Sequence, residues 1–291
     1  MTTAVVDRAV QRPTATRAPL GRLLRSELRL VLRRPRTLVV LGLLALVPVV
    51  AGIGIAIAAD SGALGDERPD GGGMASLVEG NGLLLPVFSL VIAMTMLLPL
   101  VGAMLSADAL AGEAASGTLR GLMVAPVGRA RLLAVKAFGV AAVTALAVLL
   151  MTVTGAVAGV VLLGGDGMLT ISGTTLPFGA GLGRVLLFAA LVTFQVWALS
   201  AVALAVSAMT EHPLVVVAVA LGLVIVSGVL NAIPALDWLT PVLITTSWGD
   251  LPDVISDPMP TGNLVEGLLR GGCYLLIGYS LALSRMLTRD G

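Results

Sequence analysis

Few side chains in this sequence could carry out chemistry. His212 is the only histidine and Cys273 the only cysteine among the 291 residues. A single cysteine excludes an intrachain disulfide and a cysteine-cluster metal site, and a single histidine excludes histidine-rich zinc sites. Lys136 is the only lysine and follows Val135, whereas a phosphate-binding loop needs a glycine directly before its lysine. We therefore expect no catalytic residues, no metal site and no ATP hydrolysis by this chain.

The amino-acid composition is typical of a membrane protein rather than of a soluble domain. Hydrophobic residues make up 57% of the chain and charged residues only 12%, about half the charged share of a soluble domain. A membrane-spanning helix needs about 20 apolar residues. Six stretches meet this need, and the sequence predicts an all-α membrane protein whose six-span domain covers 37–288, with spans at about 37–59, 83–107, 137–165, 185–209, 213–233 and 264–284. Pro48, Pro86 and Pro99 predict kinks in the first two spans.

The distribution of basic residues predicts the orientation of these spans. Fifteen of the eighteen lysines and arginines fall before the first span, between the second and third spans, or after the sixth. The other three are Arg68, Arg184 and Arg270, in or beside the alternate loops. Because basic residues favour the cytoplasmic side, both ends of the chain are predicted to be cytoplasmic. We expect a multi-pass protein of the plasma (inner) membrane.

The segment before the first span divides into two parts. Residues 1–19 are rich in Thr, Ala and Arg and predict a disordered leader. Residues 20–36 predict an amphipathic helix in the cytoplasmic interface, with leucines on one side and, on the other, Arg22, Arg25, Arg29 and Arg33 facing anionic lipid head groups. Glu27 falls on the apolar side, so it needs a partner. That partner is either Arg34 or the head groups, or it is a group on another element such as the loop around Glu113.

That loop, between the second and third spans, is the most informative part of the sequence. Gly117 and Thr118 can begin a short helix capped by Thr118. Its apolar face would consist of Leu119, Leu122 and Met123, and Pro126 would end it. Such a helix is shaped to dock into another protein, although a helix that lies against lipid would have the same spacing.

This loop resembles that of a known family. Glu113, Gly117, Thr118, Leu119, Pro126, Val127, Arg129, Leu132 and Lys136 form a series similar to the loop between spans 2 and 3 of ABC-2 type transporter permeases. The segment from Glu27 to Thr37 is similar to the interfacial helix of the same family. A departure is that Glu113 is followed by Ala-Ala-Ser rather than by further charged residues.

The resemblance implies the fold and partners of that family. It implies a type V exporter-like permease fold, a second permease copy or paralogue, and a dimer of cytoplasmic ABC ATPases that binds ATP and magnesium. No cofactor would bind this chain itself. The resemblance also implies that the segment from Gly117 to Met123 is the coupling helix, which inserts into a cleft of the ATPase. Glu113, Pro126 and Arg129 belong to the same coupling region, where Arg129 would hold the loop to lipid head groups or to the partner. Short re-entrant helices are implied between Asp237 and Gly262.

Other polar residues near the spans have simpler interpretations. Glu266 and Arg270 are four residues apart and can pair near the outer end of the sixth span. Gln195, Thr193 and Asn231 are expected to form hydrogen bonds between helices. Gly155 and Gly159 allow another helix to approach closely.

The function expected from these features is export of a hydrophobic, drug-like or lipid-like substrate, driven by a separate ATPase. Membrane lipids are expected partners and nucleic acid is not. Two alternatives stay open. One is a membrane scaffold or regulator that recruits a partner, and the other is an ion-coupled carrier. The uncharged middles of the spans count against a carrier, since carriers place ionisable groups near the midplane.

Overall fold

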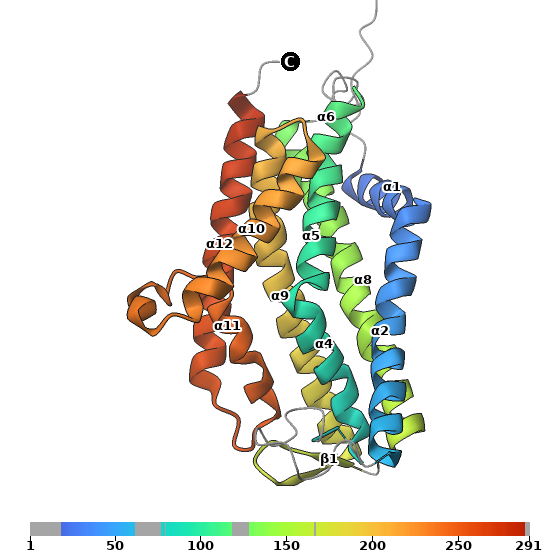
Figure 1. Ribbon diagram of the computed structural model, residues 1–291. Coiled ribbons are helices and arrows are strands. Elements are labelled where there is room, and N and C mark those ends of the chain that lie inside the picture. Colours follow the sequence, from blue (N-terminus) through green and yellow to red (C-terminus); the bar gives the residue numbers. More distant parts are fainter. Residues whose placement is uncertain (1–18, 62–76, 79, 118–127, 166, 289–291) are drawn as a thin grey trace, which may run out of the picture.

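Long helices run side by side through most of the protein (Figure 1). The computed structural model describes residues 19–61, 77–78, 80–117, 128–165 and 167–288. The elements in the first half are α1 Leu20–Leu32, α2 Pro35–Asp60, the 3-10 helix η1 Gly82–Leu84, α4 Leu85–Thr95, α5 Leu97–Ala107, the π-helix η2 Asp108–Gly112, and α6 Glu113–Ala115. The remaining elements are α8 Arg129–Leu163, β1 Gly167–Leu169, β2 Thr175–Pro177, α9 Phe178–Met209, α10 Pro213–Asn231, η3 Pro234–Leu239, α11 Thr246–Gly249, η4 Leu251–Ile255 and α12 Thr261–Thr288.

Within the described ranges, five helical segments are long and apolar enough to cross a membrane. They are Pro35–Asp60, Leu97–Ala115, Arg129–Leu163, Phe178–Met209 and Pro213–Asn231. These correspond to the first five predicted spans, and the third and fourth begin several residues earlier than predicted. The sixth predicted span lies within α12, which is a continuous helix of 28 residues. Because α12 also carries Glu266, Arg270 and two tyrosines, its apolar character is weaker and it is not one of these five.

The second predicted span differs most from expectation, because the chain breaks at Met96. There φ is −152° and ψ is −41°, which separates α4 from α5. Pro99 accounts for this break: it has no N–H for the carbonyl of Thr95, and its ring would collide with that carbonyl in a regular helix. Pro86 instead lies in the first turn of α4, where proline is tolerated, and α2 continues unbroken through Pro48.

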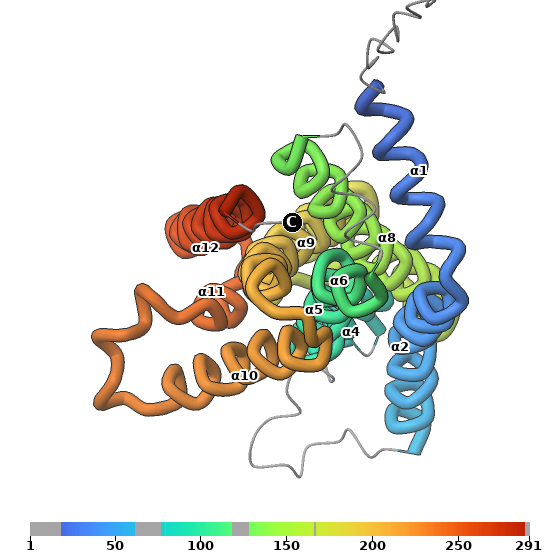
Figure 2. The backbone as a smooth tube through the Cα atoms, turned by 90° about the horizontal axis from the view of Figure 1, so that it is seen from above, coloured from blue at the N-terminus to red at the C-terminus, as the bar shows by residue number. Residues whose placement is uncertain are grey.

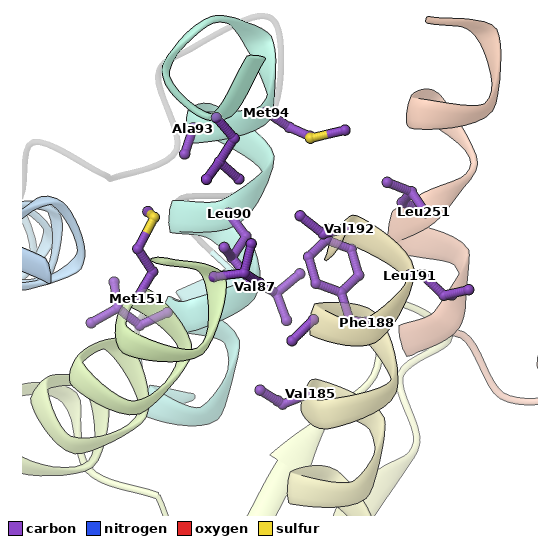
Figure 3. Packing of buried hydrophobic residues seen from close by; sticks show 14 of the residues in the cluster. Val87, Leu90, Ala93, Met94, Met151, Val185, Phe188, Leu191, Val192 and Leu251 are labelled. Carbon is purple, nitrogen blue, oxygen red and sulfur yellow. The ribbon is translucent and has the colours of Figure 1, made fainter. Parts of the chain in front are cut away.

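The core lies where α4 is enclosed by α8 and α9. Phe188 of α9 is fully buried and points toward Val87 and Leu90 of α4 (Figure 3), and Met151 of α8 packs into the same cluster. Helices at the periphery, in contrast, expose large apolar side chains, such as Val50 of α2 and many residues of α10. This distribution suits a protein whose outer surface contacts lipid.

Glycines allow the helices to approach closely, as predicted for Gly155 and Gly159. A Cβ atom added to Gly159 would lie 2.0 Å from the carbonyl oxygen of Gly82. One added to Gly155 would lie 2.8 Å from Cα of Pro86. The start of α4 therefore packs directly against the backbone of α8.

Two ends of the bundle can be distinguished in Figure 1. One end, called the α1 end, carries α1, α6 and the last turn of α12, and the strand β1 lies at the opposite end. Seen from the α1 end in Figure 2, α9 lies in the middle, with α12 on one side and α8 on another. Helix α1 extends sideways from the start of α2.

Candidate functional site

The centre of the candidate site is Lys136, the only lysine, on α8 at the α1 end. Its side chain is only 4% exposed. Its Nζ atom donates hydrogen bonds to both carboxylate oxygens of Glu27 on α1, at 3.0 and 3.2 Å, and another to Oε1 of Glu113 on α6. Glu27 therefore pairs with another element, which was the second of its two predicted interpretations. Three segments that are far apart in the sequence meet at one ammonium group.

Local sequence explains how α1 reaches this lysine. Glu27 lies on the less exposed side of α1, while its four arginines at 22, 25, 29 and 33 are exposed. Gly139, one turn after Lys136, lets α1 approach, since a Cβ atom there would lie 3.0 Å from Cγ of Glu27. The predicted helix over 20–36 is shorter than expected: α1 ends at Leu32, and Pro35 already begins α2.

A second group of charges adjoins the first. Arg36, at the start of α2, contacts Asp108 with 2.6 Å between Nη2 and Oδ2, and Nη1 of Arg34 lies 4.0 Å from the same oxygen. The first group carries two carboxylates against one ammonium, and the second carries one carboxylate against two guanidinium groups. The formal charges of the two groups therefore add up to zero. We call this set the charge cluster: Glu27, Arg34, Arg36, Asp108, Glu113 and Lys136.

The charge cluster lines an open cleft at the α1 end. The cleft has a volume of about 910 Å³ and also borders Gly112, Ser116 and Pro213. Charges removed from water are costly unless they are paired and hydrogen-bonded. Every member of the cluster has an oppositely charged group within 4.0 Å, so the cluster can bind its elements together with its charges balanced.

A π-helix places Asp108 and Glu113 at the cluster. Its cause is Ser207 of α9, whose hydroxyl accepts a hydrogen bond from the N–H of Ala111 at 3.0 Å and donates one to the carbonyl of Ala107 at 3.3 Å. In a regular α-helix those two backbone groups would bond to each other. A side chain that inserts between them widens the turn, and π-turns often occur at functional sites.

The predicted docking loop begins directly beside the cluster. Gly117 follows the end of α6: its φ is +72°, a left-handed conformation that favours glycine, and its N–H donates to the carbonyl of Ala114. Thr118, Leu119, Leu122, Met123 and Pro126 lie outside the described residues.

Comparison with known proteins identifies the family. A family model described as ABC-2 family transporter protein matches residues 22–250. The chain belongs to this family. The match takes in every member of the charge cluster and ends before α12. A search of curated proteins found no match.

Family membership makes this chain the permease of an ABC transporter, a multi-pass membrane protein. It also implies that the permease works with an ABC ATPase. The charge cluster includes Glu113, four residues before the predicted coupling helix begins at Gly117.

Arg129 of the permease connects α8 to α12. Its Nη1 donates to the carbonyl oxygens of Met286 at 3.1 Å and Leu287 at 2.9 Å. These carbonyls belong to the last turn of α12, where a cation is favourable. Among the described residues Arg129 thus bonds to α12, whereas the sequence predicted that it holds the loop to lipid head groups or to the partner.

The other polar residues that the sequence singled out form structural contacts. Arg270 pairs with Glu266 at 2.7 Å, as predicted, and Arg270 is 10% exposed while Glu266 is 65% exposed. Gln195 donates to the carbonyl of Gly267 at 3.1 Å and so joins α9 to α12, as expected. Thr193 instead bonds to Ala189 within its own helix.

Short helices occupy the segment before α12, as the resemblance implied. They are η3, α11 and η4, and Oδ1 of Asn231 accepts a 3.3 Å hydrogen bond from Thr246 in α11. Burial raises the pKa of Asp250 between α11 and η4, and the nearby carboxylate of Asp253 raises it further.

The sequence did not predict Asp108, Arg34 and Arg36 as site residues. A signal was nevertheless present. An aspartate follows the second apolar stretch, two arginines precede the first, and the orientation rule places both at the same membrane face.

Proposed function

We propose that this permease is the membrane-spanning subunit of an ATP-driven exporter whose energy comes from a separate ATPase dimer. In this proposal α12 is the sixth span, both ends of the chain are cytoplasmic, and a second permease copy or paralogue completes the path. The arginine distribution supports this orientation. The gathering of α1, α6 and the end of α12 at one end of the bundle also supports it.

Helix α1 is proposed to lie in the cytoplasmic membrane interface. Its arginines are exposed on one side, whereas Glu27 and four of its leucines (residues 23, 24, 28 and 32) are partly buried. The leucines at 20 and 30 are exposed. Because arginine attracts anionic head groups, this arrangement favours a position parallel to the membrane surface.

The observation that carries the mechanism is the double pairing of Lys136 with Glu27 and Glu113. The segment Gly117–Met123, as coupling helix, follows α6 directly. A displacement of this helix by the ATPase would move Glu113, and Lys136 would transmit that movement to α1 and α8. Two of these elements lead directly into the membrane, so movement of the loop would tilt the spans.

The cargo is proposed to be hydrophobic, drug-like or lipid-like. The first five predicted spans contain no charged residue, whereas a charged cargo would need ionisable partners inside them. The two charges in the first half of α12, Glu266 and Arg270, pair with each other. The charge cluster lies at the α1 end, outside the path that this cargo would take.

Reconstitution tests this proposal. The permease is purified with the ATPase that co-elutes, placed in liposomes, and assayed for ATP-driven movement of hydrophobic compounds. Leu119→Asp should reduce transport about tenfold or more while the protein still inserts, because an apolar anchor in an interface is worth about 2 kcal/mol.

The matched control is Leu287→Asp, at an exposed leucine of α12 at the same end of the bundle. It should leave transport within about twofold, since exposed substitutions have small effects. Wild-type transport by Leu119→Asp would contradict the coupling role. If no ATPase co-elutes and nothing is transported, the scaffold interpretation is favoured instead.

A further inference from the structure

An apolar groove runs between α8 and α12, with α9 as its floor. Its volume is about 230 Å³, below the range of about 300–1,000 Å³ typical of sites for drug-sized ligands. Aromatic and aliphatic side chains form most of the lining, which includes Ala137, Phe138, Trp197, Ala201, Leu275 and Tyr279. Phe138 is 41% exposed, so the groove opens sideways to the surface of the bundle.

Specific contacts shape the groove. Helix α12 packs closely on α9, because a Cβ atom on Gly278 would lie 2.6 Å from the carbonyl carbon of Ala201. Trp197 of α9 donates through Nε1 to the carbonyl of Ala141 on α8 at 3.0 Å. At the α1 end, Arg129 joins α8 to the last turn of α12. The groove is therefore bounded by helices that are tied together, rather than by loosely placed side chains.

Two arginines lie on α8 and α12 beyond the end of the groove that faces the α1 end, although neither is among the lining residues. Arg129 lies eight residues before Ala137, about 12 Å along α8, and Arg285 lies six residues after Tyr279, about 9 Å along α12. Within the described ranges neither arginine forms an ion pair with a carboxylate. Arg129 contacts only neutral carbonyl oxygens there, so its charge is not compensated by an acid.

We propose that this groove holds one acyl chain of an anionic phospholipid of the cytoplasmic leaflet, with the lipid phosphate near Arg129 and Arg285. The apolar lining suits a hydrocarbon chain, and the small volume suits part of a lipid rather than a whole drug-sized molecule. The two arginines supply complementary charge at head-group depth. The leaflet is the cytoplasmic one because the proposed orientation places the α1 end on the cytoplasmic side.

Trp197 allows a direct test, because a bromine atom on a lipid chain quenches a tryptophan that it touches. The full-length chain with Trp238→Phe and Trp248→Phe retains Trp197 as its only tryptophan. It is placed in phosphatidylcholine nanodiscs with increasing mole fractions of chain-brominated phosphatidylglycerol or chain-brominated phosphatidylcholine. We expect phosphatidylglycerol to reach half-maximal quenching at an at least fivefold lower mole fraction.

Substitutions in the protein distinguish binding of the lipid head group from binding of the acyl chain. Arg285→Gln should raise the half-maximal mole fraction of phosphatidylglycerol about fivefold, the factor expected for one basic residue near a membrane surface. Arg184→Gln, in the first turns of α9 at the β1 end and so far from the end of the groove that faces the α1 end, should leave it unchanged. Ala137→Phe should fill the groove and weaken quenching by both lipids.

Two results would overturn the proposal. Equal quenching by both lipids, unchanged in Arg285→Gln, would show only unselective contact with bulk lipid. An absence of quenching by either lipid would show that protein, such as a second copy of the chain, covers the groove. Because the measurement needs neither ATP nor a partner, its failure would leave the proposed transport function untouched.

Discussion

At the scale of single residues, Lys136 is the most consequential side chain. A buried ammonium that contacts two carboxylates from different elements links α1, α6 and α8 through one atom. The sequence predicted that Glu27 needs a partner, because a carboxylate on the apolar side of a helix cannot remain unpaired. It could not identify that partner, since Glu27 and Lys136 are 109 positions apart and helical periodicity carries no information over that distance.

Lys136→Met tests the contribution of this residue to stability. The substitution keeps an unbranched side chain of similar length but leaves Glu27 and Glu113 without their cation. We expect the free energy of unfolding to fall by about 3–5 kcal/mol, as is typical when one partner of a buried ion pair is removed. Denaturant titration in detergent micelles, followed by circular dichroism, would measure this change.

The triple variant Lys136→Met, Glu27→Gln, Glu113→Gln is the matched comparison. It removes all three charges, so most of the lost stability should return. Arg25→Met, which removes an exposed charge from α1, should change stability by less than about 0.5 kcal/mol. A triple variant no more stable than Lys136→Met alone would show that the charges themselves are not the source of the effect.

At the scale of elements, hydropathy predicted the long helices, but it did not predict the break at Met96 or the π-helix at 108–112. Four apolar stretches, the first, third, fourth and fifth, became single helices long enough to cross a membrane, because about 20 apolar residues specify a span with little ambiguity. Pro99 signalled the break at Met96, although the length of the stretch favoured a single span. The π-helix at 108–112 carried no local signal, since it depends on Ser207, which is 96 positions from Ala111.

The contact between α8 and the start of α4 gives a prediction at this scale. Gly159→Ala should destabilise the protein by about 1–3 kcal/mol, the range for overpacking, because its Cβ atom would meet the backbone of Gly82. Gly222→Ala in α10 is the control, since a Cβ atom there meets nothing within 4 Å. It should be neutral or stabilising by up to about 1 kcal/mol. Midpoints of thermal unfolding would rank the two variants, and equal effects would contradict the close approach of the two backbones.

At the scale of the whole molecule, the arginine distribution and the arrangement of the helices point to the same orientation. The family match covers residues 22–250 and so includes the charge cluster but not α12. The sequence predicts that the segment before the first span and the loop between the second and third spans lie at the same membrane face, because successive spans cross in alternate directions. It could not predict which charges meet there, since that depends on how α1, α2 and α8 pack.

Labelling of single cysteines tests this orientation. In a Cys273→Ser background, a cysteine is introduced at Ser26 in α1, at Ser61 after α2, or at Thr288 at the end of α12. A membrane-impermeant maleimide should label position 61 in intact cells, and positions 26 and 288 only after the membrane is permeabilised. Labelling of position 288 from outside would show that α12 does not cross the membrane.

The central claim is that an ATPase from outside this chain moves the loop beside the charge cluster. A photo-cross-linking amino acid at position 119 tests it most directly, in native membranes with and without ATP. We expect a cross-link to a cytoplasmic protein that contains a phosphate-binding loop, and the yield of this cross-link should change when ATP is added. Cross-links to lipid alone, or labelling of position 119 from the outer side, would contradict it.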